Sequence, residues 1–363
     1  MEVRNAHPYF MYDDILKQPE YIEKTLSKYK ETSFITKIAH QIYKSKRLIL
    51  IGCGTSFNVA LSVKDVSSHI FGKTNLVEAV PSFELVHSQF SLSNEDCIIS
   101  FSHSGETHMT NKALKLAREN GCKTVSVTAF PSSTSGQTAD YVLPTLYQDE
   151  RSLAHTISYS LSFVSALLLL GALAEIQGFV GIDTFVQEEV DKLSQLIKSI
   201  LEDEEQFKNI ALNMAEKDLL VFVGTGTSLG VASEIALKSI ETHYTPSFNY
   251  DLEHTLHGPL PMCNEKTQFV LILPNNQVNE RTNELLMALK HIKSDSFILS
   301  PSQPFNEATN HYKLPPFNEI ISPIISVVPL QLLTYFTATN KKLNPDLIRR
   351  DNSKYHLARG AYV

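Results

Sequence analysis

An internal repeat constrains the fold of this chain more than any other feature of its sequence. Residues 47–56 read RLILIGCGTS, and residues 219–228 read LLVFVGTGTS, an offset of 172. Three further pairs of short runs match at an offset of 171 or 172: 97–101 with 269–273, 124–127 with 296–299, and 139–144 with 310–315. Repetition at a nearly constant offset indicates that one structural unit occurs twice. We therefore predict two copies of one domain.

The repeated runs predict strands, and the segments between them predict helices. The runs are short, rich in apolar or β-branched residues and soon followed by Gly, Ser or Pro, as in strands buried on both faces. Helical patterns separate them, for example at 110–119 and 231–244. This alternation is typical of a parallel sheet with helices on both faces. The predicted fold class is α/β, with two tandem, doubly wound, flavodoxin-like domains related by duplication.

The repeat also divides the chain into four segments. We expect a helical lead at 1–30, a first domain at 31–180, a second domain at 190–340 and a C-terminal tail at 341–363.

Composition and charge exclude several classes of protein. Hydrophobic residues make up 43% of the chain and charged residues 20%, as in ordinary globular proteins rather than disordered ones. The net charge of -7 argues against a nucleic-acid partner. The N-terminus lacks the apolar segment of a signal peptide. The longest apolar stretch, Ser160–Ala174, is shorter than the roughly 20 residues that span a bilayer. We expect a cytoplasmic protein with no membrane partner.

Two hydroxyl-rich loops follow predicted strands in the first copy. They are GTS at 54–56 and SHSGET at 102–107, and a helix is expected to begin behind the second. Free N–H groups at a helix N-terminus favour an anion, and ligands of doubly wound sheets bind at this edge. The matching segment of the second copy, PNNQVN at 274–279, has no hydroxyl side chain. An ordinary serine-rich cap is the alternative, but two converging loops favour a phosphorylated small molecule.

The second copy carries titratable groups instead. Glu234, Lys238 and Glu241 have the spacing of one helix face. Spacing alone favours a surface salt-bridge stripe, which is the usual role of such a pattern, and a functional cluster is the alternative. Downstream, EHTLHGP at 253–259 places two histidines beside a Gly-Pro turn. Histidine transfers protons near neutral pH, although a structural role for these two fits equally well.

Together these motifs resemble the double SIS (sugar isomerase) domain family over almost the whole chain. The chain resembles the isomerase half of glutamine–fructose-6-phosphate aminotransferase, and also stand-alone sugar-phosphate deaminases and fructosamine-6-phosphate deglycases. The resemblance rests on MYDDILKQP at 11–19, CGTS at 53–56, SHSGET at 102–107, the charged triplet above and LHGP at 256–259. It implies an isomerase-type enzyme acting at C1/C2 of an amino-sugar phosphate or a fructosamine 6-phosphate, as a deglycase, a deaminase or an ammonia-dependent aminoisomerase.

The resemblance implies a role for each matching residue. The residues expected to hold the sugar phosphate are Thr55, Ser102, Ser104 and Thr107, with Ser56 nearer the sugar. Glu241 would move a proton between C1 and C2, and Lys238 would lie near the sugar hydroxyls. His257, donated by the neighbouring subunit, would open the sugar ring, with Glu253 beside the substrate. The expected partners are therefore a phosphorylated sugar and a second copy of the chain.

The sequence departs from the family pattern at three places. The glutamine of S-Q-S-G-E-T is His103, and E-x-G-V-A-S-T-K reads ERSLAHTI at 150–157, which puts His155 at the serine and isoleucine at the lysine. Both histidines are expected to contact substrate and to change its identity. The family's Schiff-base lysine near the C-terminus aligns with Lys354 or Arg359. We prefer Lys354, because arginine stays protonated and cannot form a Schiff base. The alternative is that the tail only closes over the site as a lid.

Two further expectations concern chemistry that the chain lacks. The synthase carries a glutamine amidotransferase domain, for which these residues leave no room, so we expect no glutaminase activity. Neither cysteine nor histidine spacing suggests a disulfide framework or a metal site. We expect no metal and no other cofactor. The rival interpretation is a sugar-phosphate sensor without catalysis, but no basic helix-turn-helix precedes residue 31.

Overall fold

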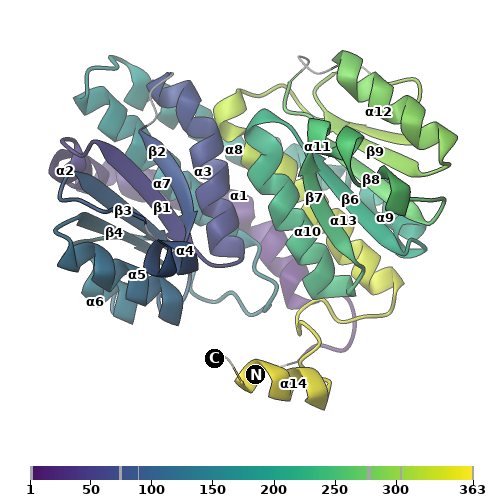
Figure 1. Cartoon of the computed structure of the whole chain (residues 1–363), viewed down its shortest axis with the longest axis horizontal. Coiled ribbons are helices and arrows are strands. Elements are labelled where there is room, and N and C mark those ends of the chain that lie inside the picture. Colours follow the sequence, from purple (N-terminus) through teal and green to yellow (C-terminus); the bar gives the residue numbers. More distant parts are fainter. Residues whose placement is uncertain (1–2, 73–75, 89, 276–278, 303–304, 362–363) are drawn as a thin grey trace.

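Two five-stranded parallel sheets organise the molecule (Figure 1), a computed structural model that describes residues 3–72, 76–88, 90–275, 279–302 and 305–361. The first sheet has the order β2-β1-β3-β4-β5 and the second β10-β9-β8-β6-β7. Both follow the flavodoxin-like order 2-1-3-4-5. The predicted fold class is confirmed. The strands are β1 Arg47–Gly52, β2 Val77–Pro81, β3 Asp96–Phe101, β4 Lys123–Thr128, β5 Tyr141–Pro144, β6 Leu219–Gly224, β7 Ser247–Asp251, β8 Thr267–Ile272, β9 Asp295–Ser300 and β10 Asn310–Lys313.

Helices cover both faces of each sheet. In the first half they are α1 Phe10–Glu31, α2 Phe34–Ile42, α3 Thr55–Phe71, α4 Ser82–His87, α5 His108–Glu119, α6 Thr134–Thr138 and α7 Ile157–Ile176. The later ones are α8 Ile182–Glu202, α9 Glu204–Ala215, α10 Leu229–His243, α11 Leu252–His257, α12 Asn279–His291, α13 Ser322–Asn340 and α14 Ser353–Gly360, with short 3₁₀ turns at Gly226–Ser228, Leu260–Met262 and Glu319–Ile321.

The strands keep the repeat read from the sequence, except that one pair of strands is shifted and another pair was not predicted. The first strands of the two halves begin at residues 47 and 219, which preserves the offset of 172. The last pair, β5 and β10, begins at residues 141 and 310, two residues short of the predicted match. Sequence reasoning missed the edge strands β2 and β7. Their residues are only partly buried, so neither has the continuous apolar run that marks an interior strand.

A single apolar core joins the two halves. It runs from one sheet to the other through a central layer of helices that includes α3, α7, α10 and α13. Smaller cores lie under α4 and α5 on the outer face of the first sheet, and under α11 and α12 on that of the second. The halves are therefore fused face to face, and the relative position of their strand ends is set by packing.

Two central helices are apolar all round. The helix α7 has 20 residues and a mean hydropathy of 1.9, and Glu319–Asn340 has 22 residues and a mean hydropathy of 1.6. The expectation that the first apolar stretch is too short to span a bilayer is wrong by length. Both helices, however, are buried over the whole apolar window inside the protein. A helix that is hydrophobic on every side suits the core of a large protein equally well.

The N-terminal helix ties the C-terminal tail to this core. Asp346 accepts hydrogen bonds from the backbone N–H groups of Phe10 (2.9 Å) and Met11 (2.8 Å) at the start of α1. Further along α1, the buried Gln18 amide donates to Gln331 on α13 (2.7 Å). The final helix α14 stands apart from both domains in Figure 1.

The helices α3 and α10 cross closely where the two halves meet. A Cβ built on Gly230 of α10 would lie 2.6 Å from the backbone nitrogen of Ser62 on α3, so only glycine permits this approach. The N–H of Gly230 donates to the Asp65 carboxylate of α3 (3.1 Å). Burial raises the pKa of Asp65 to about 6, although Lys64 opposes the shift.

This carboxylate is expected to make stability depend on pH. The unfolded carboxyl loses its proton near pH 4, whereas the folded one keeps it to about pH 6. The folded state is therefore penalised as the pH rises through this window, by about 3 kcal/mol at most. The free energy of unfolding of Asp65→Asn, relative to that of wild type, should therefore rise by roughly this amount between pH 4 and pH 7. Urea unfolding at the two pH values measures it. An unchanged difference between the two proteins at both pH values would contradict the prediction.

Candidate active site

The SHSGET loop leads from β3 into the N-terminus of α5. The Ser102 hydroxyl accepts a hydrogen bond from the Gly105 N–H (3.1 Å) and lies 3.1 Å from the Thr107 hydroxyl. The Ser104 hydroxyl accepts the N–H of Glu106 (3.2 Å). The Glu106 carboxylate is held by the backbone N–H (2.9 Å) and the hydroxyl (2.6 Å) of Thr134. The loop is thus braced from within, with its hydroxyls gathered at a helix N-terminus that favours an anion.

Contacts between strand ends bring the two hydroxyl-rich loops to one edge of the sheet. The strands β1 and β3 are parallel neighbours, so the loops that follow them meet at the same edge. Thr110 in the first turn of α5 lies 3.6 Å from the sulfur of Cys53, beside the GTS loop, and 3.1 Å from the hydroxyl of Ser82 after β2. Thr55 itself begins helix α3. Two helix N-termini therefore share this edge.

Gly105 is required by the shape of the SHSGET loop. Its φ is +69°, and a Cβ there would lie 1.8 Å from the Ser133 hydroxyl oxygen. Gly105→Ala should lower the free energy of unfolding by about 2 kcal/mol, because alanine resists positive φ and the added methyl has no room. Urea unfolding measures the loss. Gly360→Ala, where a Cβ meets no atom within 4 Å, is the control; an equal loss in both variants would refute the argument.

The charged triplet of α10 is mostly buried and faces the first domain. Glu234 is 0% exposed and Lys238 1%, which rules out a surface salt-bridge stripe, whereas Glu241 is 21% exposed. The Lys238 ammonium ion-pairs with Glu241 and lies 3.6 Å from Glu234. Glu234 in turn accepts hydrogen bonds from Asn58 (2.8 Å) and Thr55 (3.2 Å) of α3. A chain of polar contacts therefore runs from the GTS loop to Glu241.

The pKa shifts of this triplet follow from burial and pairing. Burial raises the pKa of Glu234 to about 7, and the neighbouring Lys238 charge only partly opposes this. Burial would lower the pKa of Lys238, but the charges of Glu241 and Glu234 outweigh it and hold the pKa above its ordinary value. Lys238 is therefore a fixed cation beside a more accessible carboxylate.

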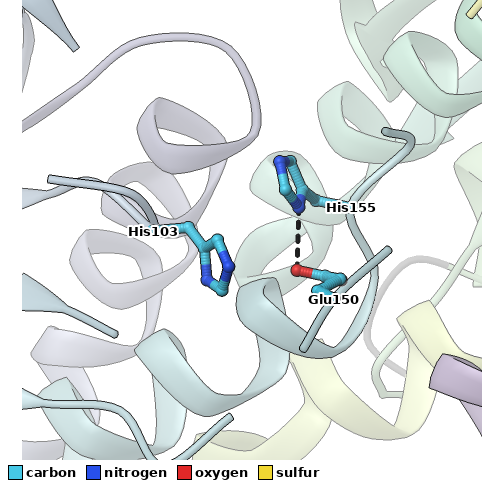
Figure 2. A group of neighbouring side chains, drawn as sticks. All are labelled: His103, Glu150 and His155. Atoms are coloured by element: carbon cyan, nitrogen blue, oxygen red, sulfur yellow. Dashed lines mark hydrogen bonds and ion pairs between the residues drawn. The ribbon is translucent and has the colours of Figure 1, made fainter. Parts of the chain in front are cut away.

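Two histidines and a glutamate meet next to this triplet (Figure 2). The Glu150 carboxylate, 0% exposed, pairs with His155 Nδ1 at 2.8 Å. The ring centroids of His103 and His155 are 5.1 Å apart. Burial alone would raise the pKa of Glu150, but the His155 charge and hydrogen bond hold it below its usual range. Burial lowers the pKa of His103. The charges of Lys238 and Glu241 also act on the pKa of His155. The histidine–glutamate group and the charged triplet therefore interact electrostatically.

Other residues expected at the site lie elsewhere on this single chain. His257 is 75% exposed on α11, and its ion-pair partner is Glu253 (3.4 Å), which also binds Arg281. Lys354 is exposed on α14, and Arg359 of the same helix is partly buried. The structure brings none of them to Glu241 within the described part of one protomer. The second copy was expected to lack a hydroxyl loop at 274–279. Residues 276–278 of that segment lie outside the described ranges.

Sequence reasoning undervalued three residues that the structure places at this centre. Asn58 was not singled out, and Glu234 was noted as a member of the charged triplet without a role of its own. Glu150 was read only as the start of a departing motif, yet it anchors His155 and also accepts the backbone N–H of Thr156 (2.6 Å). A glutamate followed five residues later by a histidine in an extended loop carries no spacing signal, so the sequence offered little to find this pair.

Comparison with known protein families decides the nature of the first domain. Residues 41–172 match the model of the SIS domain. The first domain is a SIS domain. The second sheet repeats the strand order of the first, so the same type of sheet occurs in both halves of the chain. The expected resemblance to SIS domains is confirmed over residues 41–172.

Individual relatives match nearly the whole chain. Glutamine–fructose-6-phosphate aminotransferase (isomerizing) from Thermococcus kodakarensis is 28% identical over 349 residues, which are 95% of this chain and 58% of that enzyme. The chain thus spans less than two thirds of that relative.

Solved structures show the same fold. The C-terminal domain of glucosamine-fructose-6-phosphate aminotransferase from Francisella tularensis superposes with a TM-score of 0.87 at 21% identity, covering 95% of this chain and 99% of that one. Tagatose-6-phosphate ketose/aldose isomerase from Escherichia coli has a TM-score of 0.78 at 19% identity, covering 96% of this chain and 97% of that one.

Proposed function

We propose that this protein is a cytoplasmic sugar-phosphate isomerase-type enzyme that acts at C1/C2 of an amino-sugar phosphate or a fructosamine 6-phosphate. Its reaction would be deglycation, deamination or ammonia-dependent aminoisomerisation. The names of the relatives support the substrate class, since they act on fructose 6-phosphate or tagatose 6-phosphate.

One observation carries the proposal: the hydroxyl-rich edge of the first domain contacts the charged helix of the second. Thr55 and Asn58 hydrogen-bond to Glu234, which lies against the Lys238–Glu241 pair. A substrate whose phosphate rests on the hydroxyl loops would therefore extend toward Glu241. Holding the far end of a substrate orients its reacting carbons and removes most of the entropy cost of the encounter.

The chemistry suits the groups gathered there. A C–H bond beside a carbonyl or imine is acidic enough for a positioned carboxylate to remove its proton and return it to the neighbouring carbon. Glu241 is our candidate for this carboxylate, because it is the most accessible member of the triplet. The Lys238 cation would stabilise negative charge that develops on a sugar oxygen. An imine with Lys354 would further acidify the C–H bond.

A second copy of the chain is part of the proposal. His257 is exposed, and α14 with Lys354 stands away from its own domains. Exposed apolar side chains on α14, Tyr355 (44%) and Leu357 (73%), favour burial against another molecule. We propose that a homodimer brings His257 of one chain to the Glu241 region of the other, where it would open the sugar ring.

Hydrogen exchange from solvent tests the proposal before the products are known. The purified protein is incubated in D₂O with glucosamine 6-phosphate, with fructoselysine 6-phosphate, and with fructose 6-phosphate plus ammonia. Proton NMR then follows deuterium incorporation at C1 and C2, and product formation. Each sugar without its phosphate is the matched control. We expect exchange with at least one phosphorylated sugar and at least about 100-fold less with its unphosphorylated partner, because the phosphate orients the reacting carbons.

Two outcomes would overturn the proposal. Calorimetric binding of a sugar phosphate without exchange or product formation would favour the sensor. Equal exchange with phosphorylated and unphosphorylated sugars would remove the role assigned to the hydroxyl loops.

A further inference from the structure

The group formed by His103, Glu150 and His155 has the composition of a metal site. Each residue offers one donor atom, and the three donors lie within 4.8 Å of one another. Two imidazoles and one carboxylate are a common ligand set of catalytic zinc and of non-haem iron. The residues come from two different loops, one after β3 and one after β5, so their meeting is a product of the fold (Figure 2).

The carboxylate is held in a ligand's position by backbone contacts. Glu150 Oε1 accepts the N–H of Thr156 (2.6 Å), and the N–H of Ser158 lies within 3.4 Å of the same oxygen. This leaves Oε2 turned to His155 Nδ1 at 2.8 Å. Such outer hydrogen bonds orient the ligands of metal sites and support their affinity. An ion there would take the place of the proton that now joins Glu150 and His155.

The third member has an unused donor atom. The Nδ1 of His103 is buried and has no hydrogen-bond partner among the described residues, which is costly for a polar atom. Its backbone carbonyl accepts hydrogen bonds from the Ala129 N–H (3.0 Å) and the Thr128 hydroxyl (3.0 Å), which fix the backbone that carries the ring. A metal ion would satisfy an imidazole that the protein leaves unpaired.

The surrounding charge and access also suit a cation. The neighbouring Lys238 cation is paired with Glu241 and lies close to Glu234, so its repulsion is offset. The Glu150 side chain is fully buried, whereas that of His155 is 36% exposed. One side of the group is therefore open to solvent or to a small ligand. A zinc ion bound by three side chains keeps such a position for a water or a substrate oxygen.

We propose that His103, Glu150 and His155 form a binding site for a divalent transition metal ion such as Zn²⁺, with one coordination position open toward the Lys238–Glu241 pair. Tetrahedral zinc–nitrogen and zinc–oxygen bonds of about 2.0–2.1 Å place neighbouring donors about 3.3 Å apart. The Glu150–His155 pair, now at 2.8 Å, would open slightly, and longer separations, at most 4.8 Å, would close. The proposal concerns binding alone and does not depend on the proposed isomerase function. The D₂O exchange assay in the presence of EDTA keeps the two apart.

Metal titration of the full-length protein tests the site. Protein stripped with EDTA and dialysed is titrated with Zn²⁺ by calorimetry and with Co²⁺ by visible absorption. We expect saturation at one ion per chain. His103→Gln and His155→Ser, made separately, should each weaken binding by about 100-fold or more, because losing a ligand costs at least as much as losing its outer partner. The control is His254→Gln, which removes an exposed histidine that pairs with Asp251.

The outcomes are unambiguous. Absence of saturable binding, or equal affinity in wild type and both site variants, would overturn the proposal. Loss of binding in the His254→Gln control would assign the ion to the exposed 251–257 segment instead and would equally overturn it. Circular dichroism checks that each variant is folded. X-ray absorption of the cobalt-loaded wild type gives a readout that needs no variant: two imidazoles and one carboxylate are expected in the coordination shell.

Discussion

Glu241→Gln is expected to lower kcat by about 10²–10⁴-fold for whichever sugar phosphate the exchange assay identifies. Glutamine keeps the shape of the side chain but cannot accept the substrate proton. Lys238 retains Glu234 as a partner at 3.6 Å, so the helix should remain intact. KM should change much less, because the proposed phosphate contacts on the other domain are untouched. Deuterium exchange at C1 and C2 should fall in parallel with kcat.

The matched control for this variant is Glu205→Gln, the same substitution at a glutamate that is 79% exposed on α9. It should leave kcat and KM unchanged. If Glu241→Gln retains kcat within about twofold of wild type, Glu241 is not the base, and a different carboxylate must be sought.

Lys238→Met is expected to destabilise the fold by about 3 kcal/mol. The lysine is 1% exposed, and its removal leaves the buried Glu234 and the partly buried Glu241 without their cation. Breaking a buried ion pair by removing one partner is costly, because the remaining charge stays desolvated. The loss should lie at the lower end of the usual range, since the raised pKa of Glu234, about 7, lets that group take up a proton. Urea unfolding at pH 7 measures it.

The chain offers a control with identical spacing on its surface. Glu20 and Lys24 of α1 are also an i, i+4 pair, but their side chains are 58% and 51% exposed. Lys24→Met should cause no measurable loss, because exposed pairs are screened by water. If both lysine variants unfold at the same urea concentration as wild type, the burial of Lys238 has no energetic consequence.

The same spacing occurs in a buried pair and in an exposed pair of this chain. The spacing of Glu234 and Lys238 favoured a solvated stripe over a functional cluster, and Glu20 and Lys24 have the same spacing. Local sequence sets which side chains share a helix face. It says nothing of what packs against that face. Packing around α10, including the crossing of α3 that a glycine at 230 permits, buries one pair while the other stays in water.

The two departures from the family motifs also lie together only in the tertiary structure. His103 and His155 were noted separately as substitutions of a glutamine and a serine. In the structure their rings lie 5.1 Å apart, and Glu150, from the same loop as His155, offers a carboxylate oxygen within 4.8 Å of both. The expectation that no metal site exists rested on ligand spacing along the chain. Spacing detects only sites built from neighbouring residues, whereas this group joins two loops that follow different strands.

The sequence by itself determined the duplicated α/β architecture, the position of the interior strands and the resemblance to SIS domains. The physical reason is that apolar runs and their repetition are local properties, and each strand–helix unit must bury its own apolar face. Tertiary structure alone decided which charged side chains are buried, that the hydroxyl loops meet the charged helix, and that His103, Glu150 and His155 come together. Those facts depend on contacts between segments far apart in the chain, which no local pattern records.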